Sequence, residues 1–324
     1  MGGKIIRLFL LLILLLGSTG GPAIPGDTPF IELPYELRPF SDMTADYDSS
    51  ARNTEGDPYF LVSGQESVHP GNMAILGISS LNNYFASGDA GFLEDAETVA
   101  ENLRENSVMV NGARLFYYDF AFNLHDGPDV MTPPWYSCYA QGLALAFFSR
   151  LYEFTGDAGH LETASQINAS FLLKKGESDI WITSVENNET WFEEYPLENP
   201  SHVLNGMIAG IFGLYEYFLN TRDPGVAELL GKAISTIKNH AYDYRRPGEL
   251  SYYCLGHRVV VGVEYHQTHI KYFDLLCLIT GDAFFQKAAD DFQDDLNAWL
   301  DEFYESDSAC FVSSLFAERP THGF

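Results

Sequence analysis

The sequence of 324 residues has few basic side chains, few cysteines and a single long apolar run. Its 18 Lys and Arg stand against 45 Asp and Glu, so the formal net charge is −27. A chain with this charge lacks the basic surface that binds phosphate backbones, which excludes a nucleic-acid partner, and an anionic membrane would repel it. With 46% hydrophobic and 19% charged residues, the composition also excludes an intrinsically disordered chain.

The apolar run lies at the N-terminus. It follows Lys4 and Arg7, extends from Leu8 to Leu16 and ends in small residues, which is typical of a secretory signal peptide. It is shorter than the roughly 20 residues that a membrane span requires, and an uncleaved anchor is the alternative. We therefore expect residues 1–20 to be a signal peptide and the protein to be secreted or anchored at the outer face of the cell membrane.

The chain has an even number of cysteines, namely Cys138, Cys254, Cys277 and Cys310. In an oxidising compartment three disulfide pairings are open, and the alternative is that the cysteines are small buried apolar residues. The sequence contains no Cys-x-x-Cys pair, and His266 with His269 lacks a matched third ligand. We therefore expect no metal site.

After an extended leader over residues 21–57, helical apolar runs alternate with short stop signals. The stop signals are Ser87-Gly88-Asp89, Thr155-Gly156-Asp157, Arg222-Asp223-Pro224 and Thr280-Gly281-Asp282. Glycine suits the left-handed end of a helix, aspartate caps the start of the next helix, and proline suits its first turn. Because the aspartates recur about every 60 to 70 residues, the pattern predicts four helical hairpins. The predicted helices cover 70–86, 91–105, 134–154, 158–173, 201–219, 224–240, 266–280 and 282–303.

The first helix of each predicted pair is apolar on nearly all sides, whereas the second is amphipathic. This difference indicates an inner wall and an outer ring, so the expected fold class is all-α, an α/α barrel (toroid) of about four helical hairpins. Between the hairpins lie segments with strand character, with turns at Asn111-Gly112 and Asn187-Asn188 and a third stretch from Leu250 to Val263. We expect short β-hairpins at the active-site mouth of a barrel domain over residues 58–304, followed by a C-terminal tail over residues 305–324.

Two segments between the hairpins combine carboxylates, tyrosines and histidines. The first is Trp191-Phe192-Glu193-Glu194-Tyr195-Pro196, followed by Ser201-His202-Val203-Leu204-Asn205-Gly206. The second is Glu264-Tyr265-His266-Gln267-Thr268-His269, which leads into a predicted inner helix. Both would face the mouth, where loops usually carry function. The alternatives are a solvated acidic turn for the first segment and a capped helix N-terminus for the second.

A third segment, from Tyr242 to Arg258, holds the densest positive charge of the chain. Its arginines, which include Arg245 and Arg258, could bind a carboxylate or sulfate in bidentate fashion. They could equally neutralise neighbouring acidic side chains. The sequence leaves both interpretations open.

Together these motifs resemble the catalytic domain of D-glucuronyl C5-epimerases. The similar segments are Trp191 to Pro196, Ser201 to Gly206 with Gly213-Leu214-Tyr215, Tyr265 to Ile270, and Trp135 to Gly142. Their order and spacing match the family over residues 130 to 296. The resemblance implies an α/α barrel that inverts C5 of D-glucuronic acid residues within a polymer, giving L-iduronic acid, without an organic cofactor.

The resemblance also implies roles for individual residues. Glu194 and Tyr195 fall on the family's catalytic Glu-Tyr pair, and Tyr265 falls on a later catalytic tyrosine. Tyr252 is the best match for a further family tyrosine, with Tyr253 as the second choice. We expect substrate contacts from the polar residues of the same segments, namely Asn205, Arg245, Arg258, His266 and His269. The expected partner is an acidic uronic-acid polysaccharide, and a homodimer remains open.

The residue types fit this chemistry. C5 of a uronic acid lies next to a carboxylate, so its proton is removed only if a cation such as Arg245 or Arg258 masks that charge. Inversion then requires one group to take the proton from one face and another to deliver a proton to the opposite face.

For the two faces we expect Tyr195 with Glu194 on one side and Tyr265, helped by Tyr252 or His266, on the other. A tyrosine base has an ordinary pKa of about 10. It would therefore need a nearby cation that lowers its pKa, or a partner such as His266 that exchanges its proton.

Other functions are compatible with these residues. A uronate polysaccharide lyase on the same fold would remove the same proton and then eliminate the C4 substituent. A non-catalytic carbohydrate-binding surface protein would use the 19 Tyr, 24 Phe and 4 Trp as stacking platforms. A glycoside hydrolase is disfavoured, because Glu193 and Glu194 would point to opposite faces of a strand.

Overall fold

The structure is a computed structural model that describes residues 30–45, 59–62 and 65–306. It divides into two compact units, residues 1–30 and residues 31–324, and the helices and strands below belong to the second. The predicted signal peptide, much of the predicted leader, Cys310 and nearly all of the predicted C-terminal tail lie outside the described residues. No helix among the described residues is both long and apolar enough to cross a membrane.

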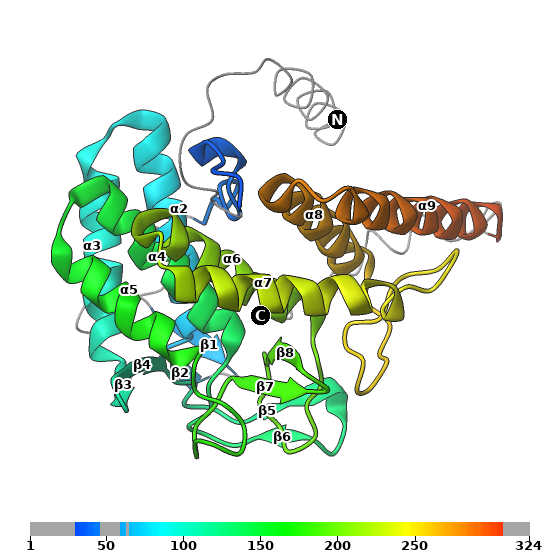
Figure 1. The fold of residues 1–324 in the computed structure, drawn as a ribbon, viewed down its shortest axis with the longest axis horizontal. Coiled ribbons are helices and arrows are strands. Elements are labelled where there is room, and N and C mark those ends of the chain that lie inside the picture. The colour runs from blue at the N-terminus through cyan, green and yellow to red at the C-terminus, as the bar shows by residue number, and fades with distance from the viewer. Residues whose placement is uncertain (1–29, 46–58, 63–64, 307–324) are drawn as a thin grey trace. The chain divides into compact units, whose positions relative to one another are not determined.

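Four helix pairs make up most of the described fold (Figure 1). They are α2 (Pro70–Ser87) with α3 (Ala90–Glu105), α4 (Cys138–Thr155) with α5 (Ala158–Ser170), α6 (Leu204–Thr221) with α7 (Pro224–His240), and α8 (Val263–Thr280) with α9 (Ala283–Ser306). These pairs confirm the predicted helical hairpins. α4 begins at Cys138 and not at residue 134, because Trp135 pairs with Tyr118 in an antiparallel bridge.

Each predicted stop signal lies where one helix ends and the next begins. In three of them a glycine takes the left-handed conformation at the helix end, with φ between 68° and 71°. These glycines are Gly88, Gly156 and Gly281. The next helix then begins with a cap, because an aspartate carboxylate accepts a hydrogen bond from a backbone N–H of its first turn. The capping residues of α3, α5 and α7 are Asp89, Asp157 and Asp223.

Short antiparallel hairpins accompany the helices. They are β1 (Phe60–Val62) with β2 (Gln65–Ser67), β3 (Ser107–Val110) with β4 (Ala113–Phe116), β5 (Phe122–Asn123) with β6 (Val130–Met131), and β7 (Thr183–Glu186) with β8 (Glu189–Phe192). The chain also makes short 3-10 turns at η1 (Tyr35–Leu37), η2 (Leu124–Asp126) and η3 (Ala241–Asp243).

The two predicted hairpin turns are confirmed. Asn111-Gly112 joins β3 to β4 and Asn187-Asn188 joins β7 to β8, and all four residues have positive φ, as tight hairpin turns require. The prediction of a strand from Leu250 to Val263 is wrong, because the structure has no strand there. This stretch is a loop in which Tyr252 and Val260 make an isolated bridge.

The first helix of each pair forms the inner wall. α4 packs against both α2 and α6, α6 contacts α8, and each outer helix packs on its own partner. A Cβ atom at Gly142 on α4 or at Gly213 on α6 would collide with the backbone of the other helix. The two most buried inner helices therefore approach each other at backbone distance, which only glycine permits. This arrangement confirms the predicted α/α barrel with an inner wall and an outer ring.

Residues 31–45 bridge the inner helices near their C-terminal ends. The backbone N–H of Ile31 donates to the carbonyl oxygen of Ile279 on α8 over 2.8 Å. The Tyr35 hydroxyl donates to Asn82 Oδ1 on α2 over 2.7 Å. The segment thereby joins the first and the last inner helix and closes the ring at this end.

A buried ion pair lies beneath this segment. Arg150 on α4 donates to Glu216 on α6 over 2.6 Å, and their side chains are 0% and 1% exposed. Arg150 also donates to the carbonyl oxygen of Pro39, and Arg38 lies 3.6 Å from the other Glu216 oxygen. The carboxylate of Glu216 is therefore neutralised by two guanidinium groups.

Candidate active site

The opposite end of the inner wall, where the inner helices begin, gathers the predicted site. The backbone N–H of Cys138, the first residue of α4, donates to the Glu193 carbonyl oxygen over 2.9 Å. The backbone N–H of Leu204, the first residue of α6, donates to the Tyr253 carbonyl oxygen over 3.2 Å. These bonds tie the segment after β8 and the loop before α8 to the helix N-termini.

Glu194 is the central buried carboxylate of this end. Its side chain packs against the α6 backbone so closely that a Cβ atom at Gly206 would collide with it. Tyr253 donates to Oε1 over 3.2 Å and Asn205 donates to Oε2 over 3.5 Å. Among the described residues, no Lys or Arg forms an ion pair with it. Burial raises the pKa of Glu194 to about 7, against the opposing effect of hydrogen bonds from Tyr195 and Tyr253.

Three tyrosines lie around this carboxylate. The Tyr195 hydroxyl is 3.4 Å from the Tyr253 hydroxyl, and the Tyr195 ring stacks on Phe122 from β5 with 5.3 Å between centroids. Tyr265, in the first turn of α8, places its ring edge-on to Tyr253 at 5.5 Å and is 46% exposed. Burial, followed by the nearby Glu194 charge, raises the pKa of each of these tyrosines. They remain protonated, so of the two routes expected for a tyrosine base, the one that needs a lowered pKa is not supported and exchange of the proton with a partner is left.

The structure brings Tyr253 to the cluster and leaves Tyr252 outside it. The Tyr252 ring lies beneath the guanidinium groups of Arg246 and Arg258, at 5.5 and 5.8 Å from its centroid. Neighbouring side chains of an extended segment point to opposite sides, so only one of the two tyrosines can face Glu194. The geometry therefore favours the second choice made from the sequence.

The two predicted arginines have different surroundings. Arg245 donates to both carboxylate oxygens of Asp295 on α9, over 2.6 and 3.0 Å. Its guanidinium is also 3.7 Å from Asp291, so it neutralises acidic side chains, which was the alternative reading of its segment. Arg258 is exposed and belongs to the loop that carries Tyr253.

The two predicted histidines are buried next to Ser251. His266 Nδ1 accepts the Ser251 N–H over 2.9 Å, and His266 Nε2 donates to the Phe292 carbonyl oxygen over 2.8 Å. His269 Nδ1 lies 2.8 Å from Ser251 Oγ. Burial lowers the pKa of both histidines, that of His269 to about 3, so both are neutral near pH 7. Their contacts hold the loop against α8 and α9, and among the described residues neither forms a hydrogen bond with the Glu194 cluster.

Glu193 diverges from Glu194, as the sequence predicts. It is fully buried and accepts hydrogen bonds from His202 Nδ1 over 2.7 Å and from the His202 backbone N–H over 3.2 Å. His202 in turn stacks on Trp191 at 4.0 Å. This pair fixes the turn before α6, where His202 has φ 51°. The two adjacent carboxylates therefore have separate partners and do not form an acid–base pair.

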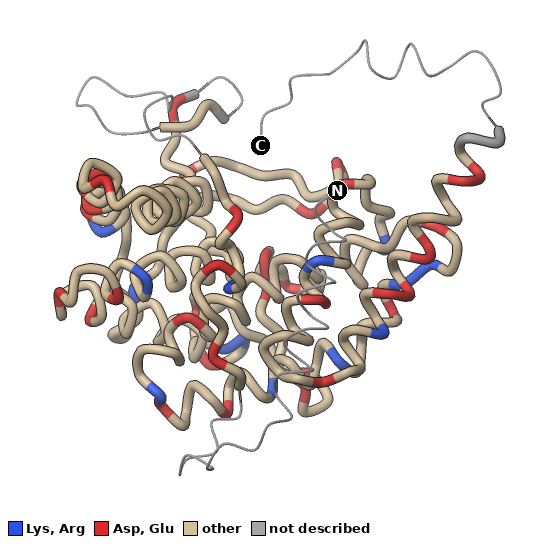
Figure 2. Tube along the Cα trace, turned by 90° about the horizontal axis from the view of Figure 1, so that it is seen from above, with Lys and Arg blue, Asp and Glu red and all other residues tan. Residues whose placement is uncertain are grey.

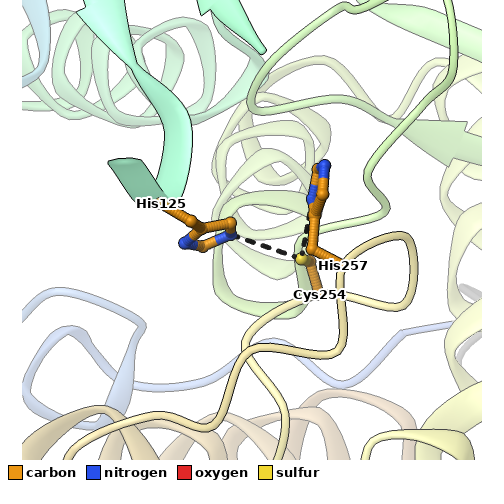
Figure 3. A group of neighbouring side chains, drawn as sticks. All are labelled: His125, Cys254 and His257. Carbon is orange, nitrogen blue, oxygen red and sulfur yellow. Dashed lines mark hydrogen bonds between the residues drawn. The ribbon is translucent and has the colours of Figure 1, made fainter. Parts of the chain in front are cut away.

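A second group of side chains near Tyr253 was missed by the sequence analysis. His125 follows β5 and packs edge-on against the Tyr253 ring at 5.3 Å. Cys254 Sγ is 3.5 Å from both His125 Nε2 and His257 Nδ1 (Figure 3). The spacing Cys254-x-x-His257 was the available signal for part of this group, since a ligand pair on one tight turn often has it.

Comparison with known proteins identifies the family of the chain. The family model described as the D-glucuronyl C5-epimerase C-terminus matches residues 111–294, more than half of the chain. The chain belongs to this family. The match confirms the resemblance drawn from the sequence.

Curated relatives match over parts of their length. The chain is 28% identical over 175 residues to an uncharacterized protein of Methanocaldococcus jannaschii, a match that covers 52% of this chain and 54% of that protein. It is 33% identical over 87 residues to the D-glucuronyl C5-epimerase of Caenorhabditis elegans, covering 27% of this chain and 14% of that enzyme. The matches thus span about half or less of these relatives.

Among solved structures, the fold is similar to a crystal structure of D-mannose isomerase. The TM-score is 0.52 at 11% sequence identity, and the likeness covers 76% of this chain and 65% of that chain. At this identity the likeness concerns the fold alone, and it agrees with the helical barrel described above.

Proposed function

We propose that the protein is a C5-epimerase that converts D-glucuronic acid to L-iduronic acid residues within an acidic polysaccharide outside the cell. The observation that carries this proposal is the state of Glu194. It is a buried carboxylate without a cation partner among the described residues, it lies next to the hydroxyl groups of Tyr195 and Tyr253, and the Tyr265 ring packs against Tyr253. Burying such a group is costly, and its raised pKa of about 7 suits a general base near neutral pH.

On the first face, Glu194 supplies the basicity. The hydrogen bond from Tyr253 to Glu194 provides a path by which a tyrosine proton moves to the carboxylate as the tyrosine oxygen takes the C5 proton. Tyr195 lies next to Tyr253 and extends this path. The carboxylate then holds the proton inside the protein, which its raised pKa favours.

On the opposite face, Tyr265 is the proton donor. Its raised pKa keeps the hydroxyl protonated, so it can deliver a proton to C5 after the first proton has left. Because Tyr265 is 46% exposed, it recovers a proton from solvent. The C5 hydrogen of the product would therefore come from water.

The substrate carboxylate also needs a positive partner. Of the two predicted arginines Arg258 is the candidate, because Arg245 is engaged by Asp295, whereas Arg258 is exposed on the loop that carries Tyr253. To reach the substrate, the Arg258 guanidinium has to leave the Tyr252 ring on which it lies. Acidic residues outnumber basic ones in the sequence and along the described part of the trace (Figure 2), so the protein repels an acidic polymer at long range. Screening within about 8 Å at physiological salt limits this repulsion, and a local arginine then determines binding.

The function is tested by NMR in heavy water. The protein is incubated with a non-sulfated glucuronic-acid polymer, C5 is followed by NMR, and ultraviolet absorbance is read in parallel. Deuterium at C5 together with iduronic signals, and no rise in absorbance, is the expected result. An absorbing unsaturated product would show a lyase instead, and binding without exchange would contradict an enzymatic role on that polymer.

The same assay tests the tyrosine assignment. Tyr253→Phe removes the hydroxyl that bonds Glu194, so we expect the rate of C5 exchange to fall about 100-fold or more. Tyr252→Phe is the matched control, because that hydroxyl lies outside the cluster, and its rate should stay within about twofold of wild type. Equal losses in the two variants would contradict the placement of these side chains.

A further inference from the structure

Three side chains from two distant segments meet at one sulfur atom next to the candidate active site. His125 comes from the turn between β5 and β6, whereas Cys254 and His257 come from the loop before α8 (Figure 3). Their ligand atoms all lie within 4.8 Å of one another, and no further His, Cys, Asp or Glu joins the group within the part of the chain that the structure describes.

The distances fit a tetrahedral ion. Zinc–sulfur bonds of about 2.3 Å and zinc–nitrogen bonds of about 2.0 to 2.1 Å, at a tetrahedral angle, place sulfur and nitrogen roughly 3.5 Å apart. The Cys254 sulfur is 3.5 Å from His125 Nε2 and 3.5 Å from His257 Nδ1. Both imidazole rings thus direct a nitrogen at the sulfur with the separation that a shared ion requires.

The surroundings of the sulfur are also those of a ligand. Cys254 is fully buried, yet its sulfur lies within hydrogen-bonding distance of two imidazole nitrogens. A buried cysteine that acts only as a small apolar residue would not collect these polar neighbours.

The outer nitrogen of one histidine has a carboxylate partner. His257 Nε2 lies 2.7 Å from Asp129 Oδ2, so Nδ1 is the nitrogen that faces Cys254. Ligand histidines in metal sites commonly donate their other N–H to a carboxylate in this way, which fixes the ring orientation and strengthens the ligand.

We propose that His125, Cys254 and His257 bind one zinc ion, with water at the fourth position. A donor set of two imidazoles and one thiolate suits zinc, and three protein ligands leave one position open. The ion cross-links the β5–β6 hairpin, whose Phe122 stacks on Tyr195, to the loop that carries Tyr253. The three ligands act as positioning residues for the tyrosines. The proposal of a metal site does not depend on the reaction proposed above.

Metal binding is measured on the purified full chain without substrate. After treatment with a chelator, the protein is titrated with Zn²⁺ against a chromophoric competitor and, separately, with Co²⁺. We expect one ion per chain, and for Co²⁺ a visible spectrum of tetrahedral type with a thiolate charge-transfer band in the near ultraviolet. At a hundredfold excess of free Zn²⁺ over Kd, Tm should rise by roughly 5 °C.

Variants separate this site from adventitious binding. His257→Ala replaces a ligand whose side chain is 28% exposed, so the variant should fold and should lose both the bound ion and the rise in Tm. Cys254→Ser should lose the charge-transfer band. Cys277→Ser is the matched control, because this cysteine lies on α8 outside the group, and it should bind Zn²⁺ as wild type does.

Several results would overturn the proposal. These are a wild-type chain that binds neither Zn²⁺ nor Co²⁺ stoichiometrically, a His257→Ala variant that binds as tightly as wild type, and a Cys277→Ser variant that loses the ion. A purified protein that carries copper with strong blue absorption would overturn the assignment to zinc, because the same donor set also forms blue-copper sites.

Discussion

The two ends of the inner wall each bury a carboxylate, and they surround it in opposite ways. At the closed end, Glu216 is 1% exposed and is paired with Arg150 at 2.6 Å and with Arg38 at 3.6 Å. At the mouth, Glu194 is 8% exposed and receives hydrogen bonds from hydroxyl and amide groups. The two ends thus differ in whether positive charge accompanies the buried acid.

This difference separates a structural carboxylate from a reactive one. Two guanidinium groups compensate the charge of Glu216, so its ionised form belongs to the packed structure. The charge of Glu194 has no such compensation, and its proton equilibrium is therefore shifted to about pH 7, where a base can both take and release a proton. Isosteric amide substitutions at the two positions are the direct way to test this comparison.

The largest effect is expected for Glu194→Gln at the mouth. The amide keeps the shape of the side chain but cannot accept the proton of Tyr253 as the tyrosine oxygen takes the C5 proton, so the rate should fall by about 100- to 10,000-fold. The measurement is C5 deuterium exchange on the glucuronic-acid polymer. Stability is measured alongside by urea unfolding, and it should be unchanged or higher at pH 8, because an uncompensated buried charge has been removed. An active variant would rule out Glu194 as the base.

A somewhat smaller effect, on stability, is expected for Glu216→Gln at the closed end. The substitution leaves Arg150 buried without its counter-ion, which should lower the free energy of unfolding by about 3–5 kcal/mol. Urea unfolding measures this loss. Activity per folded molecule should stay close to that of wild type, because Glu216 lies at the other end of α6. If instead Glu216→Gln folds normally and loses activity, the two ends have been assigned the wrong way round.

The smallest of the three effects is a pH dependence of stability. The carboxyl of Glu194 has a pKa of about 7 in the folded protein against an ordinary 4.5, so between these values the folded state binds more protons than the unfolded state. Stability contributed by this group is therefore present below about pH 4.5 and is lost as the pH rises through about 7, by up to roughly 3 kcal/mol. The difference in unfolding free energy between wild type and Glu194→Gln, measured from pH 4 to pH 8, should show this slope. A flat difference would mean that the carboxyl is solvated and has an ordinary pKa.

Much of the helical framework could be predicted because its signals are local. Gly88 ends α2, and the adjacent Asp89 caps α3. The same kind of stop-and-cap pattern recurs at the later helix pairs. The turn at Asn111-Gly112 likewise needs only its own two residues to reverse the chain. Such features do not depend on which distant segment lies opposite.

The parts that could not be predicted depend on distant contacts. Tyr253 faces Glu194 and Tyr252 does not, because the loop is oriented by the hydrogen bond from Tyr253 N–H to the Val259 carbonyl oxygen. His125 meets Cys254 across 129 residues of sequence, a pairing that no local pattern encodes. The segment that carries Glu194 and Tyr195 was singled out from its residues, but their catalytic roles came only from the family resemblance.

The segment of residues 31–45 has a consequence for the order in which the protein folds. It is synthesised before any of the inner helices, yet Asp42 pairs with Lys271 on α8, 229 residues later in the chain. During synthesis, α2, α4 and α6 can pack one after another, whereas this segment must wait for α8 before its last contacts exist. Closing so long a loop is slow. Completion of the ring therefore has to wait until α8 has left the ribosome, and until then the contacts that this segment makes with the last inner helix are missing.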